Sequence, residues 1–88
     1  MAWKIEFDRD VNKDLKKISK SDQKIIINYI KNRIAVSEDP KSFGKPLRDE
    51  FCGLWRYRVG DYRIICKIED HNLIILVITI GHRKNVYH

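Results

Sequence analysis

Apolar and polar residues alternate over residues 53–63, on both sides of the dipeptide Gly60-Asp61. This pattern predicts a β-hairpin with a two-residue turn. The predicted cross-strand pairs are Val59–Tyr62, Arg58–Arg63, Tyr57–Ile64 and Arg56–Ile65. Because side chains alternate along a strand, the aromatic and branched residues of this hairpin share one face, and its arginines share the other.

The rest of the chain predicts a single α+β domain over residues 1–88, with its elements in the order β-α-α-β-β-β. Apolar residues at helical spacing indicate two helices with a short break, capped by Asp8 and Ser21 and ending near Val36. We expect this helical hairpin to pack on a mostly antiparallel four-stranded sheet. The expected strands span residues 2–7, 53–59, 62–69 and 73–80.

The last of these strands, Leu73–Ile80, is apolar at nearly every position. Such a run is typical of a central strand that is covered on both faces. It is also far too short to span a membrane as a helix, so no membrane partner is expected.

Basic residues are unevenly distributed along the 88-residue chain, which carries a formal net charge of +6. Nine lysines and two arginines precede Leu47, whereas five arginines and two lysines lie from Leu47 onward. The net charge favours an acidic partner, with nucleic acid first. Because arginine offers a planar fork of donors to phosphate, the carboxyl-terminal half is where we expect the chemistry.

Cysteine and histidine give no indication of a metal or cofactor site. Cys52 and Cys66 have neither metal-ligand spacing nor the pattern of a disulfide framework, and His71, His82 and His88 are scattered. Few cysteines, both unpaired, fit a reduced cytoplasmic location.

The predicted hairpin places Arg58 directly opposite Arg63, with Arg56 on the same face. Like charges directly opposite each other destabilise a sheet. A local rule broken inside a consistent hairpin points to a functional site, and a bound phosphate would relieve the repulsion. The alternative is that all three side chains turn into solvent and bind nothing.

Two segments, Gly53-Leu-Trp-Arg-Tyr-Arg-Val-Gly-Asp-Tyr-Arg63 and Gly81-His-Arg-Lys-Asn-Val-Tyr87, resemble those of the RelE/ParE toxin superfamily. Within it, the chain is most similar to the RelE-type mRNA interferases of type II toxin–antitoxin systems. The resemblance implies a RelE-like fold and a ribosome-dependent endoribonuclease that needs no cofactor. It also implies three partners: a cognate antitoxin, the ribosome and translated mRNA. The toxin–antitoxin complex would in turn bind operator DNA.

By position, the resemblance implies catalytic roles for Arg63, Arg83 and Tyr87, and Arg58 lies beside Arg63 in the predicted hairpin. Preorganised cations stabilise the charge that builds on a phosphate under attack, and an aromatic ring can stack on an unpaired base. His82 is the preferred acid or base because imidazole titrates near neutral pH. The residues expected to bind RNA phosphates are Arg48, Arg56 and Lys45.

The general base is not identified, because Arg56 and Arg58 stand where the prototype toxin has two lysines, and a guanidinium is hardly ever deprotonated. Glu50 lies nearby in the sequence and could take this role. Two alternatives stay open: a ParE-like inhibitor of DNA gyrase, and a degenerate toxin that keeps only antitoxin and DNA binding.

Overall fold

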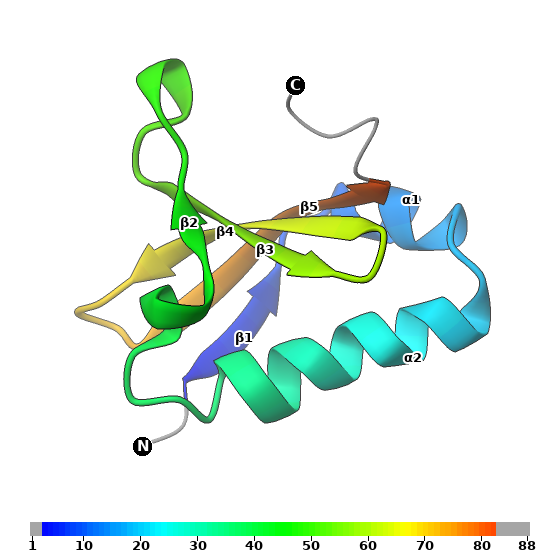
Figure 1. Cartoon of the computed structure of the whole chain (residues 1–88), viewed down its shortest axis with the longest axis horizontal. Helices are drawn as coiled ribbons and strands as arrows, with labels where there is room; N and C mark the ends of the chain where they lie inside the picture. The colour runs from blue at the N-terminus through cyan, green and yellow to red at the C-terminus, as the bar shows by residue number, and fades with distance from the viewer. Residues whose placement is uncertain (1–2, 83–88) are drawn as a thin grey trace.

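Figure 1 presents the computed structural model, which describes residues 3–82. Its helices are α1 (Val11–Lys16) and α2 (Lys20–Tyr29), and a π-helical turn η1 (Ile30–Ile34) prolongs α2. Two short 3-10 helices follow, η2 (Pro40–Phe43) and η3 (Asp49–Phe51). The strands are β1 (Lys4–Phe7), β2 (Lys45–Pro46), β3 (Leu54–Val59), β4 (Tyr62–Glu69) and β5 (Ile74–His82).

The five strands form one mixed, mostly antiparallel sheet in the order β1-β5-β4-β3-β2. Only the pair β1–β5 is parallel, and it joins the two ends of the described chain. The expectation of four strands is therefore wrong by one, because β2 adds an edge strand with the pairs Lys45↔Arg56 and Pro46↔Trp55. Two residues, one of them a proline that only an edge position tolerates, are too few to produce an alternating pattern.

The hairpin β3–β4 has the register that the sequence predicts, with Arg58 opposite Arg63 and Val59 opposite Tyr62. Gly60 has a φ of 57°, whereas Asp61 is not among the residues with positive φ. A positive φ at only the first central position is the geometry of a type II′ turn, which favours glycine there. The alternation of side chains is therefore preserved through the turn.

Both helices contribute to a single hydrophobic core against one face of the sheet, which we call the helix face. The core residues are Val11, Ile18, Ile26, Ile30, Ile34, Ala35, Tyr57, Ile64, Cys66, Ile68, Ile75, Val77 and Ile80. The opposite side carries Arg56, Arg58 and Arg63, and we call it the arginine face. In β5, Ile75, Val77 and Ile80 of the helix face are buried, whereas Ile74 and Leu76 of the opposite face are half-buried. Among the described residues the second face of this strand is therefore only partly covered, and the predicted place of the strand inside the sheet is confirmed.

Both helix caps lie two residues away from their predicted positions. The residue that caps α1 is Asp10, and Asp8 instead accepts a hydrogen bond from the amide of Arg9 at 2.7 Å. Helix α2 is capped by Ser19, whose hydroxyl accepts a hydrogen bond from the amide of Asp22. Both serines can act as caps, and the sequence alone does not rank them. No helix within residues 3–82 is long and apolar enough to cross a membrane.

Candidate phosphate-binding groove

The arginine face is hollowed at the end of the sheet where β2, β3 and β4 lie side by side. A cavity of about 130 Å³ is lined by Lys45 from β2, Arg56 and Arg58 from β3, and Arg63 from β4, with Phe43 at its rim. Antiparallel pairing alone explains this convergence, since Lys45 lies opposite Arg56 and Arg58 lies opposite Arg63. Paired residues project to the same face.

A second hollow continues the first along β2. It has a volume of about 390 Å³, and it shares Lys45 and Arg56 with the first hollow while adding Arg48 and two apolar residues, Pro46 and Leu47. We call the two hollows together the basic groove, and its cationic residues are Lys45, Arg48, Arg56, Arg58 and Arg63. All five were predicted as site residues from the sequence, and the structure brings them together.

The basic groove concentrates positive charge without neutralising it. Among residues 3–82 the ion pairs are Lys4–Glu6 and Lys41–Asp70, so none of the five groove cations is paired there. No carboxylate lines either hollow within the same range. Guanidinium groups donate forked hydrogen bonds that match the oxygens of a phosphate, so this arrangement is chemically suited to a phosphate chain.

The wall of the groove is held in place from the helix face. The hydroxyl of Tyr57 donates a buried hydrogen bond to the carbonyl of Pro40 at 2.8 Å, which ties η2 to β3. Gly44 then passes so close to the same ring that a Cβ there would lie 2.9 Å from Cε1 of Tyr57. These contacts fix the chain on both sides of Phe43 and set the position of Lys45.

Burial raises the pKa of Tyr57 well above its ordinary value, and it does the same for the thiol of Cys66. Both groups stay protonated at neutral pH, because desolvation penalises the charged form. Tyr57 is therefore a structural hydrogen-bond donor, and it does not supply the missing base of the groove.

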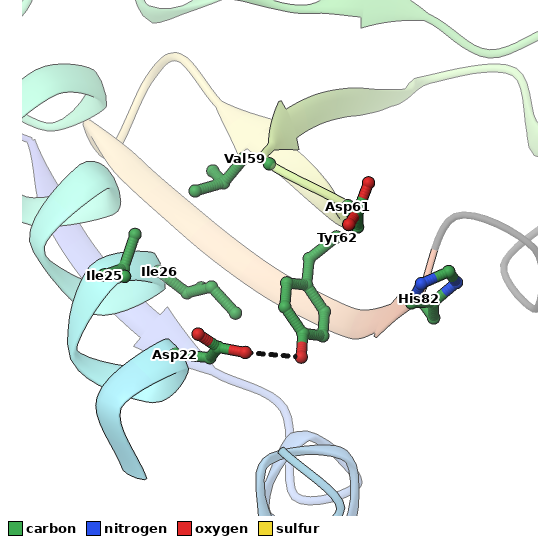
Figure 2. Close-up of a pocket in the computed structure, with 8 residues that line it drawn as sticks. Asp22, Ile25, Ile26, Val59, Asp61, Tyr62 and His82 are labelled. Atoms are coloured by element: carbon green, nitrogen blue, oxygen red, sulfur yellow. Dashed lines mark hydrogen bonds between the residues drawn. The ribbon is translucent and has the colours of Figure 1, made fainter. Parts of the chain in front are cut away.

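His82 lies on the other side of the sheet from the basic groove. It pairs with Tyr62, and the two rings meet edge to face with centroids 6.1 Å apart. Together with Asp22, which accepts a 2.9 Å hydrogen bond from the hydroxyl of Tyr62, they line a cavity of about 320 Å³ beside α2 (Figure 2). The structure thus does not bring His82 together with Arg58 and Arg63, and its role as acid or base stays a prediction.

The predicted catalytic residues Arg83 and Tyr87 lie outside the described residues. Arg83 follows β5 directly in the sequence, and the penultimate residue of β5, Gly81, pairs with Arg63. Glu50, considered as a base, is an exposed residue of η3 and lines neither hollow. Within residues 3–82 no group of three or more His, Cys, Asp or Glu side chains could hold a metal ion.

The sequence-based prediction missed Phe43, an exposed aromatic residue at the rim of the groove. It lies in a loop marked by Pro40, Gly44 and Pro46, where no periodicity indicates which way a side chain points. Its position in the sequence could have indicated it. Phe43 stands two residues before Lys45, and a residue so close to a predicted phosphate-binding lysine is expected to lie near the same site.

Comparison with known proteins places this chain in a family. The family described as "ParE toxin of type II toxin-antitoxin system, parDE" matches residues 5–87. The chain therefore belongs to the RelE/ParE superfamily, whose members are toxins of type II toxin–antitoxin systems, and the predicted superfamily is confirmed.

Three of the proteins that this chain resembles carry RelE-type names. Toxin RelG of Mycobacterium tuberculosis is 26% identical over 87 residues, which are 99% of this chain and 98% of RelG. The structure of the M. tuberculosis toxin–antitoxin complex RelBE2 matches with a TM-score of 0.87 at 24% identity, covering 97% of this chain and 95% of that chain. The isolated E. coli RelE toxin matches with a TM-score of 0.70 at 16% identity, with coverages of 92% and 84%. These matches confirm the α+β RelE-like fold.

Proposed function

We propose that this RelE-like toxin is a ribosome-dependent endoribonuclease that cleaves translated mRNA in the cytoplasm. The observation that carries the proposal is the basic groove, in which five cations line two joined hollows without a carboxylate among the described residues. A face that tolerates this much uncompensated charge is suited to a polyanion, and single-stranded RNA presents one phosphate for each nucleotide.

In the proposed reaction the 2′-oxygen of a nucleotide bonds to the adjacent phosphorus and the bond from phosphorus to the 5′-oxygen breaks. The 2′-hydroxyl loses its proton, the 5′-oxygen gains one, and the products are a 2′,3′-cyclic phosphate and a 5′-hydroxyl. Arg58 and Arg63 lie opposite each other, so both guanidinium groups can bind the oxygens of one phosphate. Their contribution is to stabilise the charge that develops during attack.

The remaining predicted residues have supporting roles in this proposal. Lys45, Arg48 and Arg56 line the second hollow and would hold the phosphates next to the cleaved one. Arg83 would act on the leaving group, and Tyr87 would stack on a base or orient the 2′-hydroxyl. His82 remains a candidate acid or base that reaches RNA only around the end of β5.

We further propose that a cognate antitoxin binds this chain and masks the basic groove, and that the complex binds operator DNA. Solved structures of similar toxins with their antitoxins support the first part. They include the M. tuberculosis RelBE2 complex and the archaeal RelE–RelB complex from Pyrococcus horikoshii.

A second candidate function is the inhibition of DNA gyrase, because the matching family is described by the ParE toxin. The motif that separates the two functions is the tail, since ParE-like toxins generally lack the arginine and tyrosine that this chain has as Arg83 and Tyr87. A degenerate toxin without either activity is the third outcome of the experiment below.

The test is to express the chain from a tightly controlled promoter and to map mRNA ends by primer extension, and then to repeat the mapping in a purified translation system with and without ribosomes. We expect cuts within translated codons that require ribosomes, and a loss of about 100-fold or more in rate for Arg63→Ala. The matched control is Lys67→Ala, which removes an exposed cation of the same strand and the same face that does not line the groove.

Cleavage that survives Arg63→Ala would overturn the assignment of the groove. Growth arrest with intact mRNA and with gyrase-dependent DNA breaks would establish the ParE-like function instead. A chain that neither cleaves RNA nor arrests growth would be the degenerate toxin.

A further inference from the structure

Phe43 is a large apolar side chain in an unusual setting. Its side chain is 39% exposed, and it lines the same cavity as Lys45, Arg56, Arg58 and Arg63. An aromatic ring left in contact with water beside four cations gains little from burial, so the hydrophobic effect alone does not account for its position.

The position of Phe43 is nevertheless well determined. The residue ends η2, and the Tyr57–Pro40 hydrogen bond anchors the start of that helix. On the other side, Gly44 packs against the ring of Tyr57 and Lys45 joins the sheet. A ring held on a rigid segment can receive a flat ligand without the entropic cost of ordering a loop.

One neighbour of the ring is also a cation. The guanidinium carbon of Arg33, an exposed residue of η1, lies 5.6 Å from the centroid of Phe43, within the range of a cation–π contact. Arg33 therefore helps to orient the ring and extends the positive charge of the groove past Phe43. Proteins that bind single-stranded nucleic acid use this combination, in which a basic groove follows the phosphates and aromatic rings stack on the bases.

From this geometry we infer that Phe43 is a base-stacking residue, and that the basic groove with Phe43 forms a nucleotide subsite for single-stranded RNA. The phosphate lies among Arg56, Arg58 and Arg63, and the adjoining base lies on the ring of Phe43. The inference rests on the proposed function, since it names the subsite that holds the RNA. Purines stack over a larger area, so the subsite prefers a purine to a pyrimidine.

The test measures binding of short 2′-O-methyl RNA oligonucleotides, which lack the nucleophile and therefore stay intact. Fluorescence anisotropy at low salt compares the wild type with Phe43→Leu, Phe43→Trp and Phe7→Leu. Phe7 is the matched control, because it is 40% exposed and lines neither hollow of the groove. We expect Phe43→Leu to weaken binding about tenfold, Phe43→Trp to restore it, and Phe7→Leu to leave it unchanged.

A second set of oligonucleotides, each with one abasic position, separates stacking from a structural role. One abasic position should weaken wild-type binding by the same factor as Phe43→Leu, and the two changes together should cost no more than either alone. If Phe43→Leu weakens binding by the same factor whichever position of the oligonucleotide is abasic, the ring only supports the loop. That result would overturn the inference. Unchanged binding by Phe43→Leu, or no measurable binding by the wild type, would also overturn it.

The same assay separates this inference from the proposed function. If Arg63→Ala weakens binding while Phe43→Leu does not, the stacking site is wrong and the phosphate-binding groove stands. If Arg63→Ala leaves binding unchanged and the chain does not cleave mRNA on ribosomes, the proposed function itself fails.

Discussion

The two faces of the hairpin β3–β4 are built from the same two strands. The polar groups of one face are hydrogen-bonded within the protein, whereas the cations of the other face have no ion-pair partner among the described residues. On the helix face, Tyr57 is 1% exposed and donates to Pro40, and Tyr62 donates to Asp22. On the arginine face, Arg58 and Arg63 lie directly opposite each other and neither has an ion-pair partner within residues 3–82.

Under the proposed function, the helix face is the one that the fold needs and the arginine face is the one that binds RNA. Satisfied polar groups inside a packed core contribute to stability, and removing one partner leaves an unpaired group behind. Uncompensated like charges oppose folding and are retained where a ligand neutralises them. Substitutions on the two faces should therefore change stability and activity in different proportions.

The largest effect on stability is expected for Tyr57→Ala. It removes a buried ring from the core together with the hydrogen bond to Pro40, and we expect the free energy of unfolding to fall by about 3–5 kcal/mol. Urea unfolding followed by circular dichroism measures the loss. Tyr57→Phe is the control that keeps the ring, and it should cost about 1–3 kcal/mol for the buried carbonyl left unpaired. Equal stabilities of the two variants would contradict the packing role of the ring.

A smaller loss is expected for Gly44→Ala, which tests the connection between the two faces. The new Cβ would lie 2.9 Å from Cε1 of Tyr57 and 3.0 Å from the carbonyl oxygen of Arg56, so the loop that carries Phe43 and Lys45 must shift. We expect a loss of about 1–3 kcal/mol together with weaker RNA binding. Gly53→Ala is the control that adds a methyl group without a steric clash, since nothing lies within 4 Å of its Cβ position. Its φ of 98° adds backbone strain, which is separate from any effect on the loop. RNA binding that is unchanged in Gly44→Ala would show that the loop does not position the groove.

Stability should also fall in alkaline solution because of groups on the helix face. Burial raises the pKa of Cys66 and of Tyr57 in the folded chain above the ordinary values of 9.0 and 10.0. The unfolded chain then loses these protons first, so their contribution is complete below about pH 9 and declines as the pH rises further. Urea unfolding between pH 8 and pH 11 measures the decline, which Cys66→Ala and Tyr57→Phe should each make shallower. If a variant loses stability with rising pH as steeply as the wild type does, the substituted residue is not a source of the alkaline loss.

The register of the hairpin was predictable from the sequence because it depends on local features. Apolar and polar residues alternate from Trp55 to Val59 and again from Tyr62 to Ile64, and Gly60 can adopt the positive φ that the turn requires. The same alternation predicted that Arg56, Arg58 and Arg63 share one face. The family resemblance added Lys45 and Arg48. Local patterning thus predicted which face carries most of the groove cations before any long-range contact was known.

Other features depended on contacts between distant parts of the chain. The parallel pairing of β1 with β5 and the two-residue strand β2 leave no periodic pattern. The exposed position of Phe43 depends on Tyr57 and Gly44, which meet only in the folded chain. The face of His82 depends on its pairing with Tyr62 across a sheet whose β4–β5 register shifts between Ile65 and Cys66. In each case tertiary structure, and not local propensity, sets the outcome.

The smallest effect on stability, and the most direct test of the difference between the two faces, is expected for Arg58→Gln. Removing one of two opposed cations should raise the free energy of unfolding by about 0.2–1 kcal/mol, because the cross-strand repulsion is lost. The same variant should cleave mRNA on ribosomes about tenfold or more slowly, because one phosphate-binding guanidinium is missing.

Both quantities are measured on one preparation, with Lys67→Gln as the control from the same face outside the groove. A more stable and less active Arg58→Gln is the predicted result. A variant that is less stable and fully active would contradict the claim that the arginine face is built for RNA at the expense of folding.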